Sequence, residues 1–203
     1  MITPPRYKTA RRLGAATYEK TLSPKFALRT ERKSGGKREF SRPKTDYGMK
    51  MLEKQRVRFS YGISEKQFSG YVRNANESKT SNRSEMLYAS LEVRLDNVVF
   101  RSGFAPSRQA SRQMVSHGHI FVNGKRVTIP SFKVSVGDVL TVAARSAGKK
   151  LFEGLDKKLT ETRNPAWLAL NIEKKEVKVQ GAPKADQPEL YATLRSILEF
   201  YKR

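Results

Sequence analysis

The sequence has no cysteine among its 203 residues, and this absence excludes several kinds of site at once. Without thiols the chain can form no disulfide, no thiolate zinc site and no cysteine nucleophile, and it suits a reducing compartment. Acidic residues are also scarce, with 19 Asp and Glu against 41 Lys and Arg. Most of them stand beside basic residues, as in 173–176, so no isolated carboxylate pair is available for acid–base catalysis.

Long hydrophobic runs are missing as well. No stretch approaches the ~18 apolar residues of a membrane-spanning helix, and the first residues lack the apolar segment of a secretory signal. A transit peptide is the alternative, but the basic character continues along the whole chain and favours a cytoplasmic protein. Phosphate-cradling glycine loops and the Gly-x-Ser-x-Gly turn of hydrolases are also absent. We therefore predict that the chain is not an enzyme and has no cofactor and no small-molecule substrate.

Positive charge is what the sequence has in excess. The formal net charge is +22 and the isoelectric point is near 10.4. Charge of one sign at this density repels itself unless a polyanion neutralises it, so nucleic acid is the expected partner. Since nothing in the sequence favours a membrane, we predict a non-enzymatic nucleic-acid-binding protein with no membrane partner.

The chain divides into four parts by composition. Residues 1–45 are basic and interrupted by proline and glycine, which predicts a weakly ordered arm that is either a solvated tail or ordered against phosphate. Residues 46–90 have helical periodicity, 91–155 combine helices with short strands, and 156–203 end in another helix. The apolar stripe of that last helix must cover something, and we expect it to complete the helical domain begun at residue 46.

The first helical segment carries a basic ridge. Lys50, Lys54 and Arg58 fall at positions i, i+4 and i+8, so they line one face of a helix at a spacing that can meet successive phosphates. Gly62 interrupts the segment, and Ser64, with a glutamine three positions later, has the pattern of a capping box that begins the next helix.

The central part begins with the strongest helix signal. Ser84 can cap a helix on which leucine and valine recur at helical spacing from residue 87 to residue 99, and Gly103 ends it. Arg94 and Arg101 are seven positions apart, nearly two turns, so both are expected on one flank of this helix. We expect substitution of Arg94 to weaken RNA binding without unfolding the protein, because it lies off the apolar stripe.

A second helix and a hairpin follow. Ser107 can cap that helix, which places Arg108 and Arg112 opposite its apolar face. Asn123-Gly124 between two alternating segments is a strong signal for a two-residue hairpin, and the alternation in 132–142 adds further strands. The predicted fold class is α+β, with a mostly helical domain into which a module of two helices and a small antiparallel sheet is inserted.

The two histidines of the chain, His117 and His119, flank a glycine at the start of this hairpin. A His-x-His pair can ligate zinc, but no cysteine exists and no acidic residue lies nearby to complete a site. We therefore predict no metal, and we expect these histidines to contact RNA or to pack at the entrance of the hairpin.

Several longer segments identify a family. The clearest is residues 91–105, Leu-Glu-Val-Arg-Leu-Asp-Asn-Val-Val-Phe-Arg-Ser-Gly-Phe-Ala, which His117-Gly118-His119, Val122-Asn123-Gly124 and Ile129-Pro130-Ser131 follow. Lys54-Gln55-Arg56-Val57-Arg58 precedes them, and Pro165-x-Trp167-Leu168 and the last six residues come after. Together they resemble bacterial small-subunit ribosomal protein S4, from about residue 44 to the end of the sequence.

The resemblance implies a place in the ribosome. Members of this family bind small-subunit ribosomal RNA directly and early, at a multi-helix junction in the 5′ domain, and nucleate assembly of the subunit. They lie beside neighbouring small-subunit proteins near the mRNA entry path and influence translational accuracy. The partners to expect are therefore ribosomal RNA, neighbouring ribosomal proteins and mRNA, and the expected location is the small ribosomal subunit in the cytoplasm.

The resemblance also assigns RNA-binding residues. Asp96 is expected to be a structural partner for an arginine. The positions expected to face RNA are Lys50, Lys54, Arg56, Arg58, Tyr61, Arg94, Arg101, Ser107, Arg108, Arg112, Gln113, His117, Asn123 and Lys125.

The sequence departs from the family at both ends. Many members carry a cysteine cluster for zinc in the N-terminal arm, and this arm has none, so it must order without metal. The chain ends in Tyr-Lys-Arg, where a serine usually precedes the final arginine, which makes the terminus more basic.

Two alternatives to a ribosomal protein follow from the module itself. Some pseudouridine synthases and tyrosyl-tRNA synthetases contain a similar module, but the segments on either side of it here are too short for their catalytic domains. A free-standing RNA chaperone or stress factor is the better alternative. It predicts weak, sequence-tolerant RNA binding, and it leaves the similarity of the flanking segments unexplained.

Overall fold

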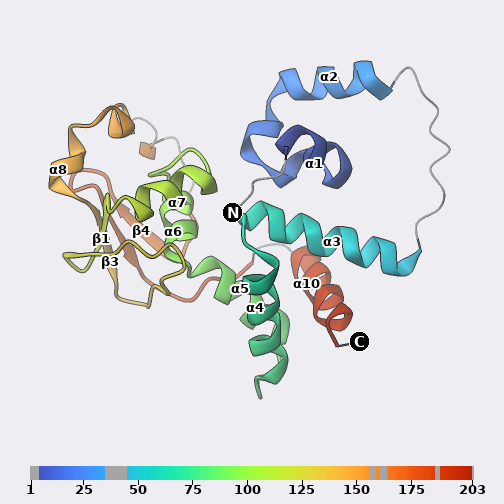
Figure 1. The fold of residues 1–203 in the computed structure, drawn as a ribbon. Helices are drawn as coiled ribbons and strands as arrows, with labels where there is room; N and C mark the ends of the chain where they lie inside the picture. The colour runs from blue at the N-terminus through green and yellow to red at the C-terminus, as the bar shows by residue number, and fades with distance from the viewer. Residues whose placement is uncertain (1–4, 35–44, 156–158, 161–163, 186–187, 203) are drawn as a thin grey trace. The chain divides into compact units, whose positions relative to one another are not determined.

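The structure, a computed structural model, describes residues 5–34, 45–155, 159–160, 164–185 and 188–202. The chain forms two compact units: the first joins the residues up to 84 to those from 187 onward, and the second comprises 85–186 (Figure 1). The boundary predicted near residue 155 is therefore displaced. Residues 164–185 belong with the central module, because they supply two strands to its sheet.

The first unit is helical in its described residues. Its elements are α1 (Arg6–Leu13), η1 (Ala15–Thr17), η2 (Glu19–Leu22), α2 (Pro24–Ser34), α3 (Asp46–Tyr61), α4 (Glu65–Glu77) and α10 (Pro188–Phe200). Two helices thus stand where the sequence predicted a weakly ordered arm. They are held by a small apolar cluster of Ala10, Tyr18 and Phe26, against which Phe59 of α3 packs. Residues 1–4 and 35–44 of that predicted arm lie outside the described residues.

The ends of α3 and α4 follow from local side chains. Thr45 caps α3 by accepting a hydrogen bond from the Gly48 amide at 3.2 Å, and Gly62 ends it in the left-handed conformation, with φ of 62°. Ser64 caps α4 by accepting from the Gln67 amide, also at 3.2 Å. The predicted break at Gly62 and the predicted cap at Ser64 are confirmed.

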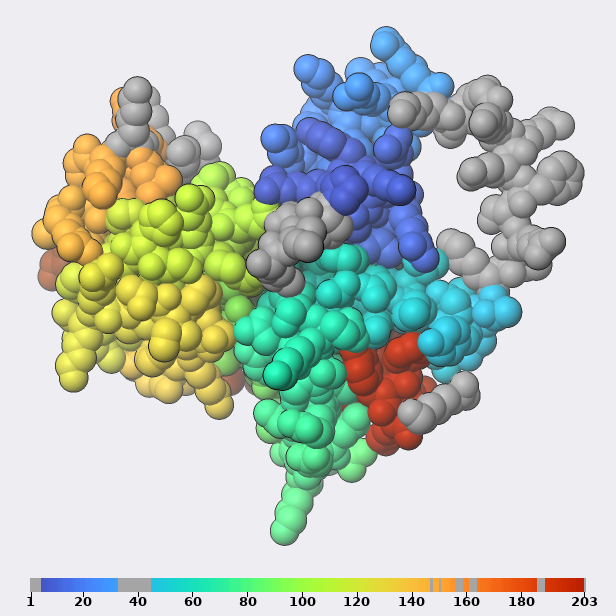
Figure 2. Space-filling view, viewed as in Figure 1, coloured from blue at the N-terminus to red at the C-terminus, as the bar shows by residue number. Residues whose placement is uncertain are grey.

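The last helix completes this unit, as its apolar stripe predicts. Helix α10 packs against α3, and Figure 2 shows its red surface between the cyan and teal surfaces of α3 and α4. Leu194, Ile197 and Leu198 of α10 are buried, and the ring of Tyr201 meets the edge of Phe68 at 6.1 Å between centroids. These contacts join two segments that are more than a hundred residues apart in sequence.

The second unit places helices against a sheet. Its elements are α5 (Arg83–Glu92), whose first two residues belong to the first unit, α6 (Leu95–Arg101), α7 (Arg108–Ser116), β1 (Ile120–Val122), β2 (Lys125–Arg126), β3 (Val139–Val142), α8 (Ala144–Ala147), η3 (Lys150–Phe152), β4 (Leu168–Asn171) and β5 (Glu176–Val179). The strands are antiparallel in the order β2-β1-β3-β5-β4. The predicted α+β fold class is confirmed.

Two short helices, α5 and α6, replace the single helix predicted between Ser84 and Gly103. The backbone is extended at Arg94, with φ of −65° and ψ of 136°, and this residue forms an isolated bridge with Lys133. The Leu95 amide donates a hydrogen bond to the carbonyl oxygen of Phe132, which stabilises the extended backbone between the two helices. The residues around 132 therefore pair with this break, and they form none of the strands of the sheet. Periodicity missed the break because the apolar stripe continues on α6, where Leu95, Val98 and Val99 join the core of the second unit.

The start of α5 also differs from the prediction. This helix begins at Arg83, and the Ser84 hydroxyl donates to the side-chain oxygen of Asn82 at 3.1 Å. The prediction that Ser84 caps the helix is wrong.

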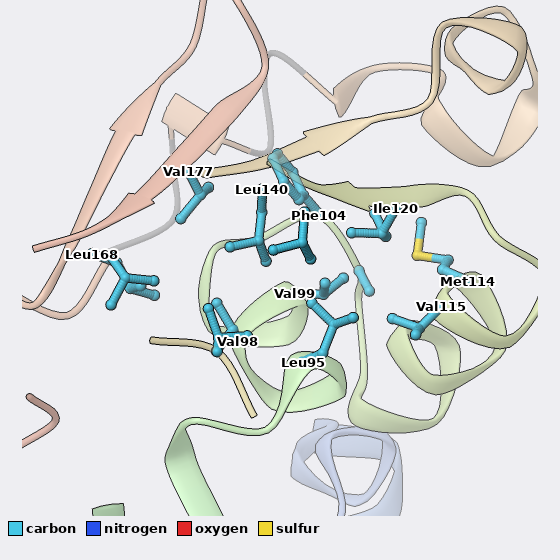
Figure 3. Packing of buried hydrophobic residues seen from close by; sticks show 14 of the residues in the cluster. Leu95, Val98, Val99, Phe104, Met114, Val115, Ile120, Leu140, Leu168 and Val177 are labelled. Atoms are coloured by element: carbon cyan, nitrogen blue, oxygen red, sulfur yellow. The ribbon is translucent and has the colours of Figure 1, made fainter. Parts of the chain in front are cut away.

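The core of this unit lies between α6, α7 and the sheet. Figure 3 shows Leu95, Val98 and Val99 of α6 converging with Met114 of α7 on side chains of the strands. Leu140 of β3 and Val177 of β5 belong to the same cluster, as does the single tryptophan, Trp167. Each such side chain contributes about 1.5–3 kcal/mol when it is fully buried. Within the described residues no helix is long and apolar enough to cross a membrane.

Candidate RNA-binding interface

Two buried carboxylates organise the arginines of α6 and α7. Asp96, at the start of α6, is 3% exposed and accepts from two arginines. Arg94 makes a bidentate pair with it, with Nε to Oδ1 at 3.0 Å and Nη2 to Oδ2 at 2.8 Å. Arg112 of α7 approaches the same carboxylate, with Nη2 to Oδ2 at 2.7 Å. Asp96 is thus a structural partner for arginine, as expected.

Glu92, the last residue of α5, is the second buried carboxylate. It is fully buried and accepts a bidentate pair from Arg101, with Nη2 to Oε1 at 2.8 Å and Nε to Oε2 at 2.9 Å. Asn97 links this pair to the next arginine: its amide nitrogen donates to Glu92, and its oxygen accepts from Arg108 Nε at 2.9 Å. The Arg108 guanidinium lies 4.5 Å from the centroid of the Phe100 ring. The helical pattern of α5 did not predict that Glu92 is buried.

These contacts hold the guanidinium groups of Arg101 and Arg112 in place and leave part of each side chain at the surface. The side chains of Arg101 and Arg112 remain 33% and 27% exposed although both are ion-paired. Because the side chains are already held, less rotamer entropy is lost when they meet a phosphate. The four arginines outnumber the two acids, so this cluster carries a net charge of 4 − 2 = +2.

Arg94 is not on a solvent-facing flank, and that prediction is wrong. Its side chain is 3% exposed and lies at the extended residue between α5 and α6, where its guanidinium meets Asp96. Arg94 therefore stabilises the cluster from its buried side, through its ion pair with Asp96. Arg101, Arg108 and Arg112 are the members with partial exposure.

The basic ridge predicted on α3 is partly buried. Lys54 is 7% exposed, and its Nζ lies 2.7 Å from Glu65 Oε1 and 5.5 Å from the ring centroids of both Phe200 and Tyr201. Arg58 reaches the same carboxylate at 3.2 Å. Lys54 thus joins α3 to α4 and the end of α10, and the structure does not present it as a surface cation.

Glu65 is the acceptor at the centre of these contacts. Burial of Glu65 opposes its ionisation, but the hydrogen bonds from Lys54 and Tyr201 and the charges of Lys54 and Arg58 hold its pKa below the usual value. Burial, together with the hydrogen bond to Glu65, raises the pKa of the Tyr201 hydroxyl. The hydroxyl donates to Glu65 Oε1 at 2.5 Å, so the C-terminal tyrosine is tied to the start of α4.

The other residues predicted in this unit have different surroundings. Arg56 is exposed, but its Nε donates to the carbonyl oxygen of Leu13 at 2.8 Å and so holds the end of α1. Tyr61 is buried, contrary to the expectation that it faces RNA. Lys50 pairs with Asp46 one turn away at 3.3 Å and keeps 26% of its side chain exposed.

The remaining predicted residues lie on α7 and the hairpin. Ser107 caps α7 by accepting from the Ala110 amide at 3.2 Å, so its predicted cap is confirmed. Gln113 and His117 are exposed, and Lys125 is exposed on β2. Asn123 takes a positive φ in the hairpin turn, as the Asn-Gly signal requires, and its side chain binds Asp138 and the Val139 amide. It is exposed, and its hydrogen bonds fix the turn against β3.

A second group of cations surrounds His119, and sequence reasoning missed it. His119 Nδ1 lies 2.8 Å from the Ser146 hydroxyl. Burial lowers the pKa of His119, as do the nearby charges of Lys149, His117, Arg145 and Arg126. The exposed side chains of Arg126, Arg145 and Lys149 thus gather at the hairpin entrance. Arg145 and Lys149 lie beyond Lys125, the last residue that the sequence was expected to direct toward RNA.

The two histidines do not form part of a metal centre in the described structure. Their rings lie 6.0 Å apart between centroids, and no group of three or more His, Asp or Glu side chains that could hold a metal ion occurs among the described residues. His119 packs at the entrance of the hairpin, with its ring 6.2 Å from that of Phe152.

Comparisons with known proteins cover both units. The S4 domain family matches residues 93–140, and the ribosomal protein S4/S9 N-terminal domain family matches residues 2–92. Small ribosomal subunit protein uS4 of Petrotoga mobilis is 38% identical, over 98% of this chain and 97% of its own length. The uS4 protein of Aquifex aeolicus is 39% identical and the uS4B protein of Nitrosomonas europaea 38% identical, each with the same two coverages.

The chain belongs to the uS4 family. The family resemblance predicted from the sequence is confirmed, and so is the inserted S4 module, whose matched segment runs from α6 to β3. The uS4 family is structural and non-enzymatic, so the prediction that the chain is not an enzyme is confirmed by its membership. Strands β4 and β5 lie beyond the segment matched by the S4 domain, although they extend the same sheet.

Proposed function

We propose that this protein is a structural component of the small ribosomal subunit, in the cytoplasm, and binds ribosomal RNA through its S4 module. Its relatives are named small ribosomal subunit proteins, and they match the chain over nearly its whole length. The single observation that carries RNA binding is the cluster of Arg101, Arg108 and Arg112, held by Glu92, Asn97 and Asp96.

The mechanism that we propose is phosphate neutralisation by oriented guanidinium groups. The side chains of Arg101 and Arg112 stay partly exposed beside the carboxylates that hold them, and guanidinium geometry suits phosphate oxygens. The spacing of α6 and α7 then selects the shape of folded RNA, because A-form helices are recognised mainly by shape and backbone. Gln113 on α7, His117 at the end of that helix and Lys125 on β2 are exposed and extend the proposed contact surface.

Salt dependence tests this mechanism. If about eight phosphates are contacted, affinity for a small-subunit RNA fragment should fall by roughly three to four decades between about 50 and 200 mM salt. Each lysine or arginine lost from a phosphate contact should lower the slope by about one. Affinity that does not change with salt would contradict the proposal.

We also propose the finer role that the family resemblance implies. The protein would bind small-subunit RNA early, nucleate assembly, and act with neighbouring proteins on accuracy near the mRNA entry path. Support for this comes from family membership and from the net charge of +22. Reconstitution that omits the protein should then stall before later proteins bind, and depleted cells should misread stop codons at a changed rate.

One sedimentation experiment separates this role from that of a free-standing RNA chaperone. A primary ribosomal RNA binder should stay with small subunits through a high-salt wash, whereas a chaperone should leave. Recovery of the chain only in the wash would overturn the ribosomal proposal and favour the chaperone.

A further inference from the structure

Helices α1 and α2 face each other across a small pocket in the first unit. Tyr7 and Arg11, one turn apart on α1, line one side, and Phe26, Arg29 and Thr30 of α2 line the other, around a volume of about 220 Å³. The pocket lies in the segment whose sequence predicted only a weakly ordered arm.

The pocket contains an aromatic ring that is backed on one side and open on the other. The rings of Tyr7 and Phe26 are stacked, 5.7 Å apart between centroids and at 23° to each other. Phe26 is 7% exposed and belongs to the small apolar cluster that holds α1 and α2, whereas Tyr7 is 48% exposed. Buried Phe26 therefore fixes the Tyr7 ring in place while about half of Tyr7 remains accessible to solvent.

The charge around this ring favours a polyanion. Residues 5–34 contain nine Lys and Arg against two Glu, a balance of 9 − 2 = +7. Arg11 and Arg29 are exposed at the pocket. Neither guanidinium is in an ion pair with any described residue, and Arg11 Nε donates only to the Tyr7 carbonyl oxygen, at 3.3 Å.

We propose that this pocket binds one unpaired base of RNA, stacked on Tyr7, with Arg11 and Arg29 on the adjoining phosphates. Bases of unpaired RNA are recognised by stacking on aromatic side chains beside basic groups. The volume is below the ~300–1,000 Å³ of pockets for drug-sized ligands, which suits a single planar base. The inference rests on the proposed function, because it names one element of the RNA partner.

Two other occupants make different demands of the site. A bare phosphate would use the arginines and leave the open ring without a role, and an apolar segment of a protein would need no flanking cations. Both become outcomes of an experiment that compares an ordinary RNA strand with a strand of the same charge that lacks bases.

Tyr7→Trp provides a reporter inside the pocket. The only other tryptophan, Trp167, is buried in the second unit, so emission that responds to stacking is obtained as the difference between Tyr7→Trp and the unchanged protein. A short uridine-only RNA should quench this difference emission, and an abasic ribose-phosphate strand of equal length should not. Equal quenching by both strands would overturn the proposal, as would no quenching while anisotropy of the labelled RNA shows binding.

Affinity measurements on the full chain provide the second test. Tyr7→Ala should weaken binding of the uridine strand by roughly 5- to 150-fold, the effect of losing one stacked base, and should leave the abasic strand unchanged. Tyr7→Phe keeps the ring and should bind as the unchanged protein does. Tyr47 is the matched control, because it is also exposed and lies beside a phenylalanine, Phe200, in the same unit.

The outcomes are distinguishable from failure of the ribosomal proposal. If Tyr7→Ala and Tyr47→Ala weaken binding equally, the base pocket is overturned, while sedimentation with small subunits still tests the ribosomal role. If circular dichroism shows that Tyr7→Ala disrupts α1 and α2, the proposal is tested instead by the quenching of Tyr7→Trp and by the affinity of Tyr7→Phe.

Discussion

The two units of the protein use carboxylates in a similar arrangement but at different depths. In the second unit, Asp96 and Glu92 are almost wholly buried, and each accepts bidentate hydrogen bonds from arginine. In the first unit, Glu65 collects Lys54, Arg58 and the Tyr201 hydroxyl, but 46% of its side chain is exposed. In both cases one acid joins several elements of secondary structure.

Depth decides how much each carboxylate contributes to stability. An exposed ion pair contributes about 0–1 kcal/mol, because water and salt screen it. Removing one partner of a buried pair costs about 3–5 kcal/mol, because the remaining charge has been taken out of water. The comparison therefore predicts that the second unit depends on its carboxylates for folding, whereas the first uses its carboxylate to hold the C-terminal segment.

The largest expected effect comes from Asp96→Ala. This change leaves Arg94 buried without its carboxylate and should destabilise the second unit by about 3–5 kcal/mol. Trp167 lies in the core of this unit, so urea unfolding followed by its fluorescence measures the loss. Glu173→Ala, at an exposed acid of the same unit, is the matched control and should change stability by less than about 0.5 kcal/mol. Equal effects of the two substitutions would refute the structural role of Asp96.

Arg94→Ala and Arg108→Ala should separate folding from RNA binding. Arg94→Ala should cost about 2–4 kcal/mol of stability, less than loss of Asp96, since Asp96 keeps Arg112. Arg108→Ala should stay within about 1 kcal/mol, because its contact with Asn97 is a hydrogen bond at a partly exposed site. Its salt slope for RNA should fall by about one.

The pair is measured by urea unfolding and by RNA titration at several salt concentrations. If Arg94→Ala is stable and weakens RNA binding as Arg108→Ala does, Arg94 faces RNA, as the sequence alone suggested. If Arg108→Ala unfolds the module, its proposed contact with phosphate loses support.

A smaller effect is expected from Glu65→Gln, which should lower the free energy of unfolding by about 1 kcal/mol or less because the carboxylate is half exposed. The folded pKa of Glu65 is lowered, so its contribution is present above the unfolded value of about 4.3 and is lost as pH falls through the folded pKa. In the unchanged protein, α10 should therefore be held less firmly at acid pH. In Glu65→Gln, α10 should be held less firmly already at neutral pH.

Hydrogen exchange of the α10 amides measures this local effect. Glu65→Gln should raise their exchange rates relative to those of α1, while Glu77→Gln, at an exposed acid on the same helix as Glu65, should not. A uniform change in both helices would mean that Glu65 acts on the whole unit instead of on the C-terminal segment.

The smallest effect concerns His119. Its pKa is lowered by burial and by Lys149, so the folded state favours the neutral ring. Its contribution is present above the unfolded value of about 6.5 and is lost as pH falls through the folded pKa. An NMR titration should show a midpoint below the ordinary histidine range, and Lys149→Ala should move it upward. An unchanged midpoint in that variant would remove Lys149 as a cause.

The parts of the fold that sequence predicted depend on local signals. Gly62, Ser64, Ser107 and the Asn123-Gly124 turn act within a few residues, and each lies where its pattern placed it. The break at Arg94 could not be predicted, because it depends on a bridge to Lys133, almost forty residues away in sequence. For the same reason, alternation in 168–179 could not indicate which sheet these strands would join.

The sequence predicted which types of residue form the candidate site better than it predicted which of them are exposed. Arginine spacing on α7 identified Arg108 and Arg112, and both are partly exposed beside the buried acids. Exposure of Arg94, Lys54 and Tyr61 was predicted incorrectly, because a basic or aromatic side chain on a helix is compatible with either environment until its partners are known. Lys54 meets Glu65 across two helices, and Arg94 turns toward the nearby Asp96 at the break in the backbone between α5 and α6.

The position of α10 has a consequence for the order in which the chain can fold as it is synthesised. The second unit is continuous in sequence, so all its strands and helices have been made before α10 is reached. The first unit needs residues from before and after the second unit in sequence. The face of α3 that α10 covers therefore stays exposed until α10 has been synthesised. Domains generally fold as units during synthesis, beginning from the N-terminus. Here the part that starts first must finish last, and a ribosome that stalls within α10 would release a chain whose second unit is complete and whose first is not.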